Sequence, residues 1–108
     1  MAGDRKQARE HYHRALPIAL DTQAIPVVLD ALSGIGQLFA QEGKLEDALM
    51  LSCFILNHPS CEIGTRSRTQ ELRLSLETGL SPKQFEAACL TGQEMTLDSI
   101  VSEVLGTA

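Results

Sequence analysis

The chain has 108 residues, 44% of them hydrophobic and 21% charged, which suits one domain with a modest core and excludes a disordered segment. Its net charge of −5 argues against a general nucleic-acid binder, which needs clustered positive charge to meet phosphates. Aromatic residues make up only 4% and tryptophan is absent. The core must therefore be built from Leu, Ile, Val and Ala, which favours closely packed helices.

The sequence also predicts the cellular setting. No apolar run reaches the ~18 to 20 residues that a membrane span requires. Residues 1–10 are polar and do not form a signal peptide. The three cysteines, an odd number without regular spacing, are typical of a reducing compartment and are expected to be small buried or half-buried thiols. We therefore expect a cytoplasmic protein without membrane contacts.

The first helix is expected over residues 4 to about 20, where apolar residues recur at intervals of three and four. Asp4 is its expected N-cap, and Gln7 completes a capping box. Pro17 predicts a kink or an early end, because an interior proline removes a backbone hydrogen-bond donor.

A helical hairpin is expected next. Its first helix begins near Pro26, since proline is well tolerated in a first turn, and ends at Gly43, a left-handed C-cap position. Its second helix covers residues 45–57. Gly36 indicates that another helix backbone approaches closely, whereas the sequence gives no reason for Gly34, which costs about 1 kcal/mol relative to alanine.

Residues 63–78 carry two patterns. Thr69, Leu72 and Leu76 lie at helical spacing, while Leu72, Leu74 and Leu76 alternate as they would in a strand. The density of Arg and Glu and the helical surroundings favour a helix.

Two further helices are expected at the C-terminal end. Ser81 is an N-cap whose capping box is completed by Gln84, and Gly92 is the expected end of that helix. Thr96 caps the last helix, which ends at Gly106. The sequence therefore predicts about six helices joined by short turns, which makes neighbouring helices antiparallel.

The hairpin carries a recognisable residue pattern. Large apolar, small and aromatic residues precede the turn glycine, and an alanine follows it, at Leu32, Ile35, Gly36, Phe39, Gly43 and Ala48. This pattern resembles the tetratricopeptide repeat, and Ala8, Tyr12 and Ala15 resemble the second helix of a preceding repeat. Ala8 and Ala48 are 40 residues apart, more than the usual ~34 of that family.

The resemblance implies an all-α fold in which antiparallel hairpins stack as a short, TPR-like right-handed solenoid. Residues 1–108 would form a single domain. Residues 4–59 would hold the repeat hairpins, residues 60–78 an incomplete repeat, and residues 79–108 the C-terminal capping helices.

The last part of the chain carries a second resemblance, in the stretches Phe85-Glu86-Ala87-Ala88 and Gly92-Gln93-Glu94-Met95-Thr96-Leu97. It resembles the C-terminus of large STAND-class signalling ATPases and transcription regulators. In those proteins a tetratricopeptide array follows an NTPase module and acts as a sensor or docking arm. The resemblance implies that this chain is the last piece of such an array.

The expected function is a non-catalytic, regulatory protein–protein interaction module with a protein or peptide partner. By the resemblance, one helix of the best repeat faces the groove with Asp30, Ser33, Gln37 and Gln41. The later arginines extend that surface and suit an acidic partner: Arg66, Arg68 and Arg73.

Two alternatives come from other classes. The chain could be a structural capping or dimerisation element, forming a homodimer through the first helix, which lacks a hairpin partner of its own. Residues 80–100 also resemble the opening of a LuxR-type helix-turn-helix. That region is acidic and no recognition helix follows it, so we expect no nucleic-acid binding by this fragment.

No residue pattern predicts catalysis. Cys53, His58 and Cys61 lack the paired spacing and the fourth ligand of a zinc site. The glycines at 34 and 36 lie inside a helix and lack the context of a phosphate-binding loop. We therefore expect no enzyme activity, no metal and no cofactor.

Overall fold

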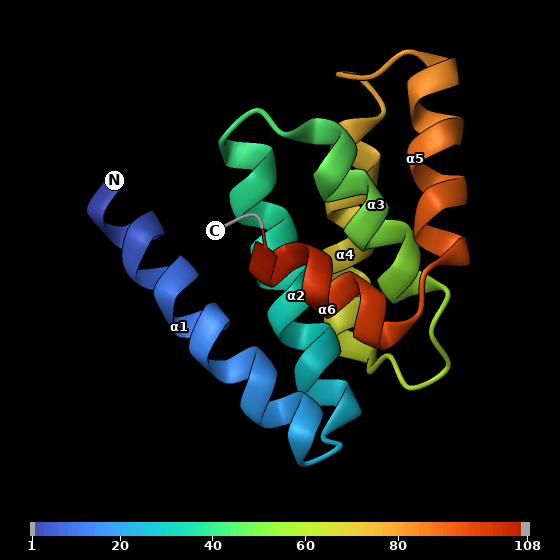
Figure 1. Cartoon of the computed structure of the whole chain (residues 1–108). Coiled ribbons are helices and arrows are strands. Elements are labelled where there is room, and N and C mark those ends of the chain that lie inside the picture. Colours follow the sequence, from blue (N-terminus) through green and yellow to red (C-terminus); the bar gives the residue numbers. More distant parts are fainter. Residues whose placement is uncertain (1, 107–108) are drawn as a thin grey trace.

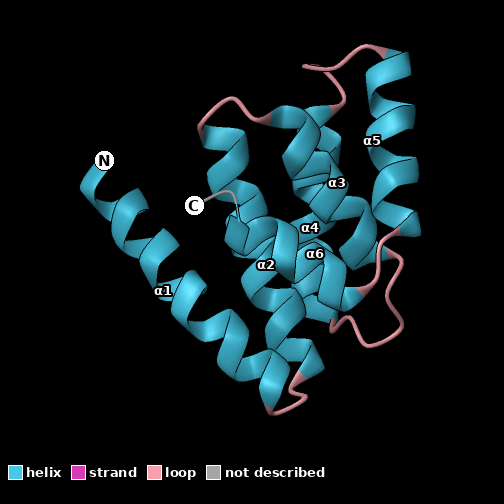
Figure 2. Ribbon diagram, in the orientation of Figure 1, coloured by secondary structure: helices cyan, strands magenta, loops and turns pink. Residues whose placement is uncertain are grey.

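The computed structural model describes residues 2–106, and side chains from residue 5 onwards, and this part of the chain is helical without strands (Figures 1 and 2). The all-α prediction is confirmed. The molecule measures 37 × 33 × 26 Å. Its helices are α1 (Ala2–Asp21), α2 (Ile25–Gln41), α3 (Leu45–Leu56), α4 (Ile63–Leu76), α5 (Pro82–Glu94) and α6 (Leu97–Gly106).

Several helix ends follow the local sequence chemistry. Gly43 has φ +82°, the left-handed conformation predicted for the turn after α2. The Gln84 amide donates to Ser81 Oγ at 3.2 Å, and the Ser81 amide donates to Gln84 Oε1 at 3.0 Å, which completes the predicted capping box. The Ser99 amide donates to Thr96 Oγ1 at 3.1 Å at the start of α6.

Three predicted helix ends are wrong. α1 already begins at Ala2, ahead of the expected N-cap Asp4, whose side chain lies outside the described residues. α1 also continues through Pro17 to Asp21, so the early end expected there is wrong, whereas the alternative, a kink, stays a prediction. α5 continues past Gly92 to Glu94 because Gly92 is buried against α3 rather than ending the helix.

The segment with two possible patterns is the helix α4, so the strand interpretation is wrong. Thr69 and Leu76 from this helix are buried, whereas Leu74 is 64% exposed. Thr69, Leu72 and Leu76 therefore lie on the inward face of the helix, as their helical spacing predicts. The alternating pattern would also have placed Leu74 on that face, which is wrong.

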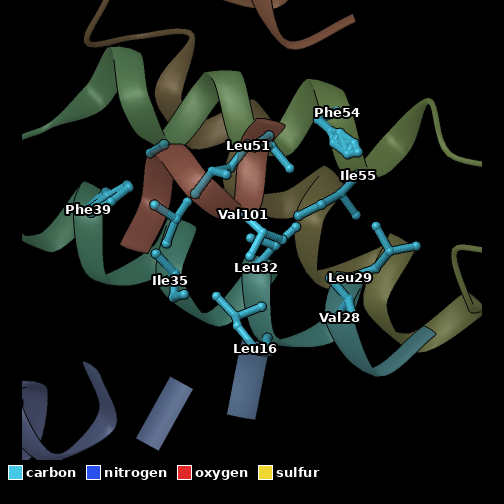
Figure 3. Close-up of a cluster of buried hydrophobic side chains, with 14 of the residues drawn as sticks. Leu16, Val28, Leu29, Leu32, Ile35, Phe39, Leu51, Phe54, Ile55 and Val101 are labelled. Atoms are coloured by element: carbon cyan, nitrogen blue, oxygen red, sulfur yellow. The ribbon is translucent and has the colours of Figure 1, made fainter. Parts of the chain in front are cut away.

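The centre of the core is built by α1, α2, α3 and α6. Leu16, Leu32 and Leu51 from the first three of these helices surround Val101 of α6 (Figure 3). Ile100 and Val104 of α6 are buried as well. The last helix is thus an integral part of the core. In Figure 1 it crosses in front of α2, between α1 and α3.

The polar and covalent contacts that join α2 to α4 and α3 to α5 span 35 to 38 residues of sequence. α2 packs against α4 and α3 packs against α5. Ser33 contacts Thr69, and Cys53 is bonded to Cys89, both across 36 residues. This spacing is shorter than the 40 residues between Ala8 and Ala48.

The two glycines inside α2 both lie at contacts with other helices. A Cβ at Gly34 would overlap the Tyr12 ring, so Gly34 makes room for an aromatic side chain of α1. A Cβ at Gly36 would lie 3.4 Å from Leu72 Cδ2 and 3.8 Å from the Ala48 carbonyl oxygen. The backbone of α3 therefore lies near Gly36, but an added Cβ would make only ordinary van der Waals contacts, and α4 approaches through the Leu72 side chain.

Candidate interaction surface

The structure brings two of the predicted partner-binding residues together where α2 meets α4. Asp30 of α2 forms an ion pair with Arg68 and accepts a hydrogen bond from Thr65 Oγ1 at 3.2 Å. The side chains of Asp30 and Arg68 are 52% and 49% exposed. Such an exposed pair contributes little to stability, typically ~0.2 to 1 kcal/mol, and stays accessible from solvent.

Ser33 lies in the interior rather than on an open groove. It is 1% exposed, and its Oγ lies 3.1 Å from Thr69 Oγ1 of α4. The Thr69 hydroxyl donates to the Thr65 carbonyl at 2.7 Å, so the Ser33 hydroxyl is left to donate to Thr69. Ser33 therefore joins α2 to α4 and is not accessible to a partner in this structure.

The hydrogen bond between the Ser33 and Thr69 hydroxyls leads to a prediction about stability. Thr69→Val keeps the side-chain shape but leaves the buried Ser33 hydroxyl without its partner, so we expect a loss of about 1 to 3 kcal/mol in the free energy of unfolding. The double variant Ser33→Ala/Thr69→Val should recover most of that loss. Urea denaturation measures both, and a double variant no more stable than Thr69→Val would contradict the assignment.

Within the described residues, the side chains of the other two polar residues predicted on α2, Gln37 and Gln41, form no ion pair with α4. Gln37 is half-buried and Gln41 is exposed at the end of the helix. The Gln41 carbonyl accepts a hydrogen bond from Arg5 Nη1 at 3.4 Å, which links α1 to this end of α2. Binding of a partner by Gln37 and Gln41 stays a prediction.

The other two predicted arginines are used inside the fold. Arg66 Nη1 donates to the Leu56 carbonyl at 3.1 Å and so closes the C-terminal end of α3. The Arg73 guanidinium lies 5.4 Å from the centre of the Phe85 ring on α5. Both side chains are half-buried, so of the three arginines only Arg68 lies beside Asp30 on the accessible surface.

The sequence did not predict an apolar groove between α1 and α2. Ile18 and Val27 stand 65% and 54% exposed beside a hollow of about 440 Å³. The signal was present in the sequence, because Ile18 is a large apolar residue off the predicted inward face of the first helix. The groove is lined by His11, Arg14, Ala15, Ile18, Ala19, Thr22, Ala24 and Val27.

The groove has an apolar floor and a basic edge. Its lining includes Arg14 and His11 but no carboxylate. Arg14 is exposed and forms no ion pair within the described part of the chain, whereas Arg9 of the same helix is paired with Glu42. The charge of Arg14 is therefore free for an acidic group on a binding partner.

The cysteines differ from the expectation of separate thiols. Cys53 of α3 and Cys89 of α5 form a disulfide, with their Cα atoms 5.3 Å apart. Cys61 is free and half-buried, and its burial raises the pKa of its thiol. The charge of Glu62 also raises this pKa, whereas the charge of Arg66 opposes the rise. A thiol with a raised pKa is a weak nucleophile at neutral pH.

The described residues hold no group of three or more His, Cys, Asp or Glu side chains able to bind a metal ion.

Within residues 2–106, the helices are too short or too polar to cross a lipid bilayer. Comparison of the chain with protein-family models, curated proteins and solved structures found no match.

Proposed function

We propose that the chain is a non-catalytic protein–protein interaction module whose α1–α2 groove binds an amphipathic segment of a partner. The observation that carries this proposal is the exposure of Ile18 and Val27 beside the groove. An apolar hollow with exposed aliphatic side chains and a polar edge is typical of a binding site.

The chemistry of the groove defines the partner. A helix that lies in an apolar groove presents aliphatic residues three and four positions apart. A carboxylate one turn away from these residues would meet Arg14 at the edge. Asp30 follows Val27 by one helical turn, so the Asp30–Arg68 pair offers polar contacts next to the groove.

The helix arrangement supports a tetratricopeptide-like module. Polar and covalent contacts of α2 with α4 and of α3 with α5 span 35 to 38 residues, slightly more than the usual ~34 of that family. A short right-handed solenoid of this kind would act as a docking arm for a signalling or transcription-regulating protein. Stacked hairpins present extended surfaces, and recognition then depends on shape and charge rather than on catalysis.

Peptide display with the whole chain as bait tests the proposal. We expect selected peptides to be amphipathic helices with Leu, Ile or Val on one face and Asp or Glu beside it. Ile18→Asp should weaken their binding at least tenfold, because it places a charge in the groove. Leu74→Asp is the matched control, since Leu74 on α4 is 64% exposed against 65% for Ile18. Peptides that bind Ile18→Asp as tightly as the original chain would overturn the proposed site.

A further inference from the structure

Two helices carry a large exposed aliphatic residue at opposite ends of the molecule. Ile18 lies on α1 and Leu90, 55% exposed, lies on α5. Figure 1 shows these two helices at the two extremes of the fold, with α2, α3 and α4 between them. One molecule cannot bring the two residues together, but two molecules can.

On each helix, two residues of opposite charge precede the aliphatic side chain on the same face, and the order of the charges is reversed between the two helices. On α1 the face reads Glu10, Arg14, Ile18, at intervals of four residues. On α5 it reads Lys83, Glu86, Leu90, at intervals of three and four. We call these sets the α1 stripe and the α5 stripe.

The two stripes match when the helices lie side by side in the same direction. Ile18 then meets Leu90, Arg14 meets Glu86, and Glu10 meets Lys83. All six side chains are exposed, and the four charged ones form no ion pair within the described part of the chain. Opposite charges one turn apart fix the register of the contact and disfavour a stripe facing its own copy in the same direction and register.

The fold already contains a helix pair of this kind. α3 and α5 run in the same direction, because Glu46 contacts Gln84 near their starts and Cys53 is bonded to Cys89 further along. α5 uses its Gly92 and Cys89 side for α3, which leaves the α5 stripe open to a second helix. An α1 from another molecule can therefore extend the row of helices beyond α5.

We propose that the chain associates head to tail, with the α1 stripe of one molecule packed against the α5 stripe of the next. This inference rests on the proposed interaction role of the groove, since Ile18 belongs to both, and it names a second copy as the occupant. The contact is heterologous, so it leaves a free stripe at each end and grows into chains rather than stopping at a dimer.

Sedimentation velocity of the whole chain tests this. We expect the average mass to rise with protein concentration beyond that of a dimer, and the association to weaken in high salt. Ile18→Asp blocks the α1 stripe and Leu90→Lys blocks the α5 stripe, so each variant alone should be monomeric. An equimolar mixture should form a dimer and nothing larger, because one open α1 stripe and one open α5 stripe remain. Leu74→Asp should associate like the original chain.

The other outcomes overturn the proposal. A chain that stays monomeric at every concentration refutes it, although peptide binding in the groove could still be found by display. If Ile18→Asp abolishes association and Leu90→Lys does not, the contact joins two α1 helices instead. A mixture of the two variants that stays monomeric also contradicts the head-to-tail contact. Circular dichroism of each variant establishes that it is folded.

Discussion

Removal of the Cys53–Cys89 disulfide is expected to lower the free energy of unfolding by about 3 to 4 kcal/mol. The bond closes a loop of 36 residues between α3 and α5, and in the chain-entropy model such a loop restricts the unfolded state by about that amount. The bond adds a covalent link to a helix in which only Gly92 is fully buried.

Denaturation with and without a reducing agent measures this effect. The double variant Cys53→Ala/Cys89→Ala should unfold at a lower denaturant concentration and should no longer respond to reduction. Cys61→Ala is the matched control, since Cys61 is free, and its unfolding should remain as sensitive to reduction as that of the original chain. Equal midpoints in the oxidised and reduced forms would contradict the prediction.

Gly92→Ala is expected to destabilise the protein by about 1 to 3 kcal/mol, the cost of an overpacked contact. A Cβ at position 92 would overlap the Met50 carbonyl oxygen and lie 3.2 Å from the Phe54 amide nitrogen. These are backbone atoms of α3 and cannot rotate away, so α5 would have to shift.

The sign of this effect is informative because alanine is otherwise favoured over glycine inside a helix by about 1 kcal/mol. Gly64→Ala in α4 is the control, since a Cβ there meets nothing within 4 Å and should leave stability unchanged or slightly higher. Urea denaturation of both variants decides the matter. A Gly92→Ala variant at least as stable as the original chain would show that α5 does not approach α3 as closely as described.

The sequence predicted where the helices lie along the chain better than it predicted which helices pack against one another. Local signals such as Gly43, the Ser81 capping box and the helical spacing in α4 depend on nearby residues, and they hold in the structure. The wrong helix ends at Pro17 and Gly92 arose because each residue was interpreted from its backbone preference alone. Gly92 is a contact point for another helix, which helical periodicity cannot reveal.

The candidate site was predicted less completely for the same reason. The resemblance to the tetratricopeptide repeat placed Asp30 and Ser33 on one groove-facing side of a helix, but it could not show that α4 covers Ser33 and leaves Asp30 accessible. The Cys53–Cys89 pair follows from the packing of α3 on α5, a contact that no sequence spacing specified. The groove beside Ile18 depends in turn on where α2 lies against α1.

The position of α6 has a consequence for how the protein is made. Ile100, Val101 and Val104 lie in the centre of a core whose other walls come from α1, α2 and α3. During synthesis the first three helices leave the ribosome long before these residues do. The central core therefore closes only once α6 has left the ribosome, and until then the apolar surface of the first three helices lacks its contacts with α6.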